Sequence, residues 1–187
     1  GGGSPQPHGN SEGTEGPADV TDEDTVLITG ASGGVGSALI QLANRRGAQC
    51  VALCGANKAD AVKAVGPLAV IDRACADLGS ALRDAIGKDS VDVVADDVGG
   101  VLWPQLINAL TRGGRYTCAG AIGGPIVEFD LRTFYLRDLT FTGATVPPPG
   151  VFGDLVGFMS TYPGTSPTSW GRGNLCSPIY THVAFRA

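Results

Sequence analysis

A glycine-rich turn early in the chain has the residue types and spacing that bind a pyrophosphate. The apolar run Thr25–Thr29 precedes the turn, and an amphipathic pattern begins at Gly34. Gly33 would let the backbone approach a pyrophosphate, and Gly36 would let the following helix sit close to the strand. The free N–H groups and the dipole at the helix start would attract the negative charge. The alternative is a glycine-rich loop in an ordinary strand–helix unit, but the strand before and the helix after favour phosphate binding.

The residues after the second predicted strand indicate which dinucleotide the turn would hold. Binding a ribose 2′-hydroxyl usually requires an Asp or Glu about 20 residues beyond the turn. No acidic residue occurs between Asp24 and Asp60, whereas Lys58 follows the strand and Arg73 follows the next one. This pattern favours a 2′-phosphate, and therefore NADP(H) over NAD. The alternative is that Lys58 solvates a helix start and Arg73 a loop.

The sequence argues against metal binding, nucleic-acid binding and a membrane span. The five cysteines are scattered without a C-x-x-C pair and there are two histidines, so we expect no metal site and reduced, structural thiols. The net charge is −5 without a basic cluster, which argues against nucleic acid as a partner. No run of 18 apolar residues suggests a membrane span, and we expect a cytoplasmic protein.

These residues would be positioned by alternating strands and helices. Predicted strands cover residues 25–29, 49–54, 69–71, 91–95, 115–119 and 139–143, and predicted helices cover 34–46, 58–65, 75–86 and 102–110, with a short helical stretch near 131–136. Val35, Ala38, Leu39 and Leu42 would form the inner stripe of the first helix, and Gly113-Gly114 would close the fourth. Near-continuous apolar strands predict a parallel sheet covered on both faces. The fold class is α/β, a doubly wound six-stranded Rossmann domain.

Three segments differ in composition. Residues 1–24 form a polar leader that we expect to be disordered, because residues 1–17 contain no aliphatic side chain. Residues 25–159 would form the NADP-binding domain, with a stiff connector at 147–150 and a helix at 151–159. Residues 160–187 have no usable periodicity, and we expect an irregular, poorly ordered tail.

The glycine-rich turn fits the sequence patterns of two dehydrogenase families. Thr29 to Gly36 also fits the pattern T-G-x-x-x-G-x-G of the short-chain dehydrogenases, which transfer a proton with a Tyr-x-x-x-Lys pair. The three lysines, Lys58, Lys63 and Lys88, do not stand four residues after any tyrosine. The chemistry of that family is therefore absent.

The chain instead resembles the nucleotide-binding domain of the medium-chain dehydrogenase/reductase superfamily, in its zinc-independent quinone oxidoreductase-like and enoyl reductase-like branch. The matching segments are residues 26–43, 91–100, 113–116, 120–124 and 131–143. The resemblance implies a pyrophosphate site at Gly33, Gly34, Val35 and Gly36, and a 2′-phosphate site at Gly55, Lys58 and Arg73. It implies ribose contacts at Val98 and Gly99, and a nicotinamide side at Ala119, Gly120 and Ala121. The alternatives are a plain strand-to-helix turn at 99–100 and a flexible loop at 120–124.

The resemblance implies hydride transfer between NADP(H) and a carbonyl or an activated double bond in a complete enzyme. Family members carry a catalytic β-barrel domain, so we expect this chain to be a fragment or a degenerate relative that keeps the cofactor half. No general acid can be named. A non-catalytic nucleotide-binding or redox-sensing module is the alternative. We also expect self-association through the sixth strand, Leu139–Gly143.

Overall fold

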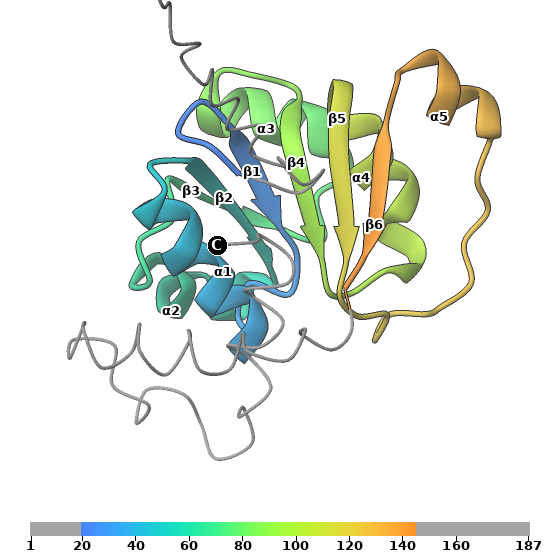
Figure 1. The fold of residues 1–187 in the computed structure, drawn as a ribbon. Coiled ribbons are helices and arrows are strands. Elements are labelled where there is room, and N and C mark those ends of the chain that lie inside the picture. The colour runs from blue at the N-terminus through green and yellow to red at the C-terminus, as the bar shows by residue number, and fades with distance from the viewer. Residues whose placement is uncertain (1–19, 145–187) are drawn as a thin grey trace, which may run out of the picture.

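The computed structural model describes residues 20–144, which form one six-stranded parallel sheet (Figure 1). The strands are β1 (Thr25–Ile28), β2 (Gln49–Cys54), β3 (Ala69–Asp72), β4 (Val91–Asp96), β5 (Leu110–Cys118) and β6 (Thr140–Gly143). Their order is β3-β2-β1-β4-β5-β6, and every neighbouring pair is parallel. The predicted doubly wound α/β fold is confirmed. The strand order reverses between β1 and β4, which is where such sheets bind ligands.

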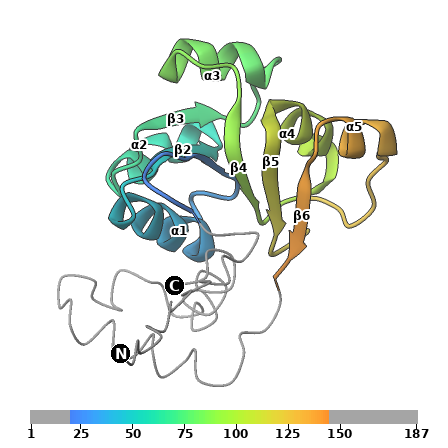
Figure 2. The same cartoon turned by 45° about the horizontal axis from the view of Figure 1, so that its top comes forward.

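Helices cover both faces of the sheet (Figure 2). The α-helices are α1 (Gly34–Arg45), α2 (Ala59–Lys63), α3 (Leu78–Ile86), α4 (Trp103–Ala109) and α5 (Leu131–Leu136), and the 3₁₀ turns are η1 (Ala56–Lys58) and η2 (Gly100–Leu102). Helices α1 and α2 lie on one face, and α3, α4 and α5 lie on the other (Figure 1). Right-handed crossovers produce this arrangement, because the chain winds first toward β3 and then toward β6.

The core has two layers because side chains alternate along each strand. Val26 and Ile28 of β1 are buried against Leu39 and Ile40 of α1, in the first layer. Leu27 of β1 points the other way and belongs to the second layer, together with buried residues of α3 and α4. The near-continuous apolar strands of the sequence thus reflect a sheet that is buried on both sides.

Several predicted boundaries differ from the structure. Helix α3 begins at Leu78 rather than at residue 75, because the Asp77 side chain caps it by accepting hydrogen bonds from the N–H groups of Gly79 and Ser80. The predicted helix over 58–65 is instead η1 followed by the five-residue α2. Apart from the start of β5, the remaining strand and helix ends agree with the prediction to within two residues.

The end of α4 departs furthest from the prediction. This helix ends at Ala109, and β5 begins at once at Leu110, so Gly113 and Gly114 lie inside a strand rather than closing a helix. The register with β4 shifts within this stretch. A residue far along the chain contacts this junction, since the Arg137 guanidinium donates hydrogen bonds to backbone carbonyls at the end of α4 and the start of β5.

The buried stripe of α1 is rotated from the predicted one. Ala38, Leu39, Ile40 and Ala43 are buried, whereas Leu42 is only half-buried. Gly36 explains the rotation, because it is buried directly against the backbone of the preceding turn and fixes which side of the helix faces the sheet.

The described part of the chain begins with a short packed segment. Val20 is 5% exposed and belongs to the first core layer, and Asp24 forms an ion pair with Arg115. Residues 20–24 therefore pack on the domain, although the sequence assigned them to the polar leader. The expectations for residues 1–19 lie outside the described residues, as do those for the connector 147–150, the helix 151–159 and the tail 160–187. Among residues 20–144, no helix is long and apolar enough to span a membrane.

Candidate functional site

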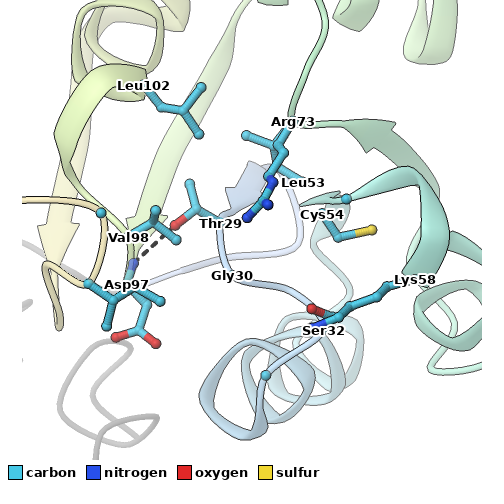
Figure 3. A pocket seen from close by; sticks show the side chains of 14 residues that line it. Thr29, Gly30, Ser32, Leu53, Cys54, Lys58, Arg73, Asp97, Val98 and Leu102 are labelled. Atoms are coloured by element: carbon cyan, nitrogen blue, oxygen red, sulfur yellow. Dashed lines mark hydrogen bonds between the residues drawn. The ribbon is translucent and has the colours of Figure 1, made fainter.

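A cavity of about 340 Å³ opens at the carboxyl ends of β1 and β4, where the strand order reverses. Residues at or after the carboxyl ends of five strands, β1 to β5, line it: Thr29, Gly30, Ser32, Gly33, Leu53, Cys54, Gly55, Lys58, Arg73, Asp97, Val98, Leu102, Ile122 and Gly123. Lys58 and Arg73 lie on one side of the Gly30 turn, and Asp97 lies on the other (Figure 3). The cavity is therefore polarised, with cations at one end and a carboxylate at the other.

The glycine-rich turn places the start of α1 at this cavity. Gly30 has a left-handed backbone with φ of 57°, and the Gly33 N–H donates to the Gly30 carbonyl oxygen over 2.8 Å. Gly33 is the N-cap of α1, and no side chain satisfies the first N–H groups of the helix. These groups, on Gly34, Val35 and Gly36, have no partner within the helix and form a ready anion site.

Gly33 and Gly36 have different structural roles within the turn. A Cβ added at Gly36 would lie 2.5 Å from the Gly30 carbonyl oxygen and 2.6 Å from the Ala31 Cα. A Cβ at Gly33 would meet only the Gly30 oxygen, at 3.2 Å. Gly36 is therefore required for helix α1 to approach the turn, whereas Gly33 lines the cavity and leaves room for a ligand.

The cationic end of the cavity is built from the loops after β2 and β3. The Lys58 N–H donates to the Gly55 carbonyl oxygen over 2.9 Å, and the Arg73 N–H donates to the Cys54 carbonyl oxygen over 2.8 Å. The first bond closes the turn after β2, and the second ties the loop after β3 to the end of β2, so the exposed Lys58 and Arg73 side chains share one end of the cavity. Asp72 ends β3 beside them, but it accepts a hydrogen bond from Ala74 N–H and does not line the cavity.

Asp96 organises the opposite half of the site, and sequence reasoning missed it. The residue is 1% exposed. It accepts hydrogen bonds from the hydroxyls of Thr29 (2.5 Å) and Tyr116 (2.6 Å), and from the N–H groups of Val98 (2.9 Å) and Gly99 (3.1 Å). A buried carboxylate requires such partners. Its signal in the sequence was an acidic residue that ends β4 directly after the apolar run Val93-Val94-Ala95.

This network fixes the turn that carries Asp97 and Val98 into the cavity. The Asp97 N–H donates to the Thr29 hydroxyl over 3.0 Å, which ties the end of β4 to the end of β1. Gly99 follows with φ of 63°, and a Cβ there would lie 3.0 Å from the Gly124 carbonyl oxygen. The 97–99 turn is therefore held from both sides, and Val98 lines the cavity while Gly99 lies behind it.

The loop after β5 contributes different residues from those expected. Ile122 and Gly123 line the cavity, whereas Ala119, Gly120 and Ala121 do not. Gly120 instead packs against Asp97, since a Cβ at Gly120 would lie 2.2 Å from the Asp97 Oδ1 atom. Gly120 thus packs against the wall of the cavity, and the predicted nicotinamide contacts of all three residues stay predictions.

The protonation of the site follows from burial. Burial raises the pKa of Asp97, and the neighbouring Asp96 raises it further. Burial and the hydrogen bond to Asp96 raise the pKa of Tyr116, which keeps its hydroxyl a donor. Burial also raises the pKa of the Cys54 thiol, so this cavity residue stays protonated and a poor nucleophile.

The described cysteines and acidic residues do not form a metal site. Cys50, Cys54, Cys75 and Cys118 are free thiols, and Cys176 lies outside the described residues. Within residues 20–144, no three His, Cys, Asp or Glu side chains are grouped so that they could hold a metal ion. A zinc ion therefore does not fit the part of the chain that the structure describes.

The fold and the cavity define a dinucleotide-binding domain of the Rossmann class. Residues 34–161 match the family model described as zinc-binding dehydrogenase. The chain belongs to this family, within the medium-chain dehydrogenase/reductase superfamily, and corresponds to its nucleotide-binding domain.

Two curated relatives support this assignment. An acryloyl-coenzyme A reductase of Metallosphaera sedula is 33% identical over 128 residues, which are 67% of this chain and 36% of that protein. A chloroplastic quinone-oxidoreductase homolog of Spinacia oleracea is 32% identical over 123 residues, which are 66% of this chain and 35% of that protein. The chain thus spans about a third of the length of these relatives.

Solved structures show the same likeness. A protein of Sinorhizobium meliloti 1021, described as an alcohol dehydrogenase, is 46% identical with a TM-score of 0.73, over 77% of this chain and 40% of that one. The 2-octenoyl-CoA carboxylase reductase CinF, solved in complex with NADP and 2-octenoyl-CoA, is 28% identical with a TM-score of 0.59. That match covers 67% of this chain and 32% of CinF.

Proposed function

We propose that this chain binds NADP(H) in preference to NAD(H), as the cofactor domain of a reductase of the quinone oxidoreductase-like and enoyl reductase-like type. The observation that carries the proposal is the polarity of the cavity. Lys58 and Arg73 share the end beside β2 and β3, and the lining residues at that end include no carboxylate. An acidic side chain there would be needed to bind a ribose 2′-hydroxyl, whereas cations bind a 2′-phosphate.

The proposed cofactor would lie extended along the cavity. Its pyrophosphate would lie against Gly33 and the first N–H groups of α1, which carry partial positive charge. Gly55, Lys58 and Arg73 would surround the adenosine 2′-phosphate. Val98 and Gly99 would border the second ribose, and the loop at Ala119, Gly120 and Ala121 would form the wall on the nicotinamide side.

In the complete enzyme, we infer hydride transfer to a carbonyl or to an activated double bond. When bound, the nicotinamide supplies the hydride, and this domain binds and orients it. The relatives support that chemistry, because their names include a quinone oxidoreductase homolog and an acryloyl-coenzyme A reductase. A nicotinamide dinucleotide and a small molecule are therefore the proposed ligands, and the cytoplasm is the proposed location.

Charge removal at the cationic end tests the proposal. Lys58→Ala and Arg73→Ala should each weaken NADPH binding by about tenfold or more and leave NADH binding nearly unchanged, because only NADPH carries the 2′-phosphate. Titration followed by nicotinamide fluorescence measures both affinities. Lys63→Ala is the matched control, since Lys63 is exposed, pairs with Asp60 and does not line the cavity. Equal losses for NADPH and NADH in the Lys58 and Arg73 variants would overturn the proposal.

A further inference from the structure

Asp97 is the single carboxylate among the described residues that line the cavity. It lies across the glycine-rich turn from Lys58 and Arg73 (Figure 3). Its backbone is anchored by the hydrogen bond from its N–H to the Thr29 hydroxyl. Its side chain passes close to the turn itself, because a Cβ added at Gly30 would lie 3.9 Å from the Asp97 Oδ2 atom. The carboxylate is thus held at the point where the strand order reverses.

This carboxylate has no partner among residues 20–144. No described side chain or N–H group donates a hydrogen bond to it, and no described cation pairs with it. The adjacent Asp96 is the opposite case, since four groups donate to its buried carboxylate. Room for the Asp97 carboxylate is provided by Gly120, where any Cβ would collide with Oδ1. A partly buried carboxylate left unpaired in a ligand cavity is available to a cation or a hydrogen-bond donor of the ligand.

The topology indicates which half of a dinucleotide would meet Asp97. A sheet of this order contains two mononucleotide-binding halves on either side of the reversal. Lys58 and Arg73 follow β2 and β3 in the first half, and Asp97 follows β4 in the second. If the 2′-phosphate lies at the cations, the nicotinamide nucleotide lies over the half that carries Asp97.

The oxidised and reduced cofactors differ in charge in that half only. The oxidised nicotinamide ring carries one positive charge more than the reduced ring, while the phosphates and the adenosine are the same. The negative charge of the ionised carboxylate, in a partly buried cavity, favours the more positive form. We propose that Asp97 makes the site bind the oxidised cofactor more tightly, relative to the reduced one, than it would without this carboxylate. The inference rests on the proposed function, and it makes the bound reduced cofactor the stronger hydride donor.

The test is the ratio of two dissociation constants in the full 187-residue chain and in Asp97→Asn. Isothermal titration calorimetry with NADP⁺ and NADPH gives both constants. The ratio Kd(NADPH)/Kd(NADP⁺) should fall by about threefold to tenfold in Asp97→Asn, because the two ligands share every charge except that of the ring. A tenfold fall corresponds to a rise of about 30 mV in the potential of the bound cofactor. Asp97→Ser should lower the ratio as well.

Controls separate this inference from the proposed function. Asp72→Asn removes a carboxylate outside the cavity on the adenosine side and should leave the ratio unchanged. The fragment 2′,5′-ADP, which lacks the nicotinamide half, should bind Asp97→Asn within about twofold of the parent. An unchanged ratio in Asp97→Asn and Asp97→Ser, with both cofactors still bound, would overturn the role of Asp97 alone. Failure of the parent chain to bind either cofactor would overturn the proposed function and this inference with it.

Discussion

At the scale of single residues, two adjacent aspartates at the end of β4 have opposite environments. Asp96 is buried and receives hydrogen bonds from four groups, on Thr29 after β1, on Tyr116 of β5 and on its own turn, whereas Asp97 faces the cavity without a described partner. The pleat of the strand and the turn that follows it separate them. The Asp96 carboxylate therefore stabilises the site, and the Asp97 carboxylate is available to a ligand.

The structural role of Asp96 gives a graded prediction. Asp96→Ala leaves two hydroxyls and two N–H groups without their acceptor, and should lower the free energy of unfolding by about 3–5 kcal/mol. Tyr116→Phe removes one donor and should cost only about 1–2 kcal/mol. Urea denaturation followed by circular dichroism measures both losses. Equal losses for the two variants would show that the Asp96 carboxylate is not the centre of the network.

At the scale of elements, the junction of β1 and α1 separates packing from ligand binding. Gly36→Val should lower the free energy of unfolding by more than about 3 kcal/mol, because its Cβ would collide with the backbone at Gly30 and Ala31. Gly33→Val should cost only about 1 kcal/mol, mainly from a poorer N-cap, yet it should abolish dinucleotide binding by filling the approach to the helix N-terminus. Thermal unfolding and cofactor titration of the two variants check this contrast. A Gly33 variant that still binds the cofactor would exclude this turn as the phosphate site.

The parts of this architecture that depend on local sequence could be predicted. The six strands and the glycine turn follow from apolar runs and from spacing, and their ends shift by one or two residues in most cases. Contacts between distant segments could not be predicted. The start of β5 at Leu110 accepts a hydrogen bond from Arg137, which lies 27 residues away, and the Asp96 network depends on Tyr116 of β5 and on Thr29, which follows β1. The cavity residues Ile122 and Gly123 were missed for the same reason, since only the folded loop shows which of its residues turn inward.

At the scale of the whole molecule, β6 forms one edge of the described sheet, and exposed apolar residues lie beside it. Strand β6 pairs with β5 on one side and with no other described strand. Leu131 and Leu136 of the adjacent α5 are 69% and 59% exposed. An unpaired edge beside apolar side chains favours association with a second copy.

Self-association through β6 is therefore expected. Sedimentation velocity should show a concentration-dependent dimer, and Thr142→Lys on β6 should shift the equilibrium to the monomer, because charge on an edge strand opposes strand pairing. Ala85→Lys adds the same charge on the exposed side of α3 and should leave the dimer intact. A parent chain that stays monomeric at high concentration would contradict this expectation.

The central claim is that the cavity between β1 and β4 holds NADP(H), and titration of the unmodified chain with NADPH and with NADH tests it most directly. Nicotinamide fluorescence should show saturable binding of NADPH that is at least about tenfold tighter than that of NADH, since Lys58 and Arg73 would meet the 2′-phosphate of NADPH alone. Equal affinity for the two cofactors, or no saturable binding of NADPH, would contradict the account.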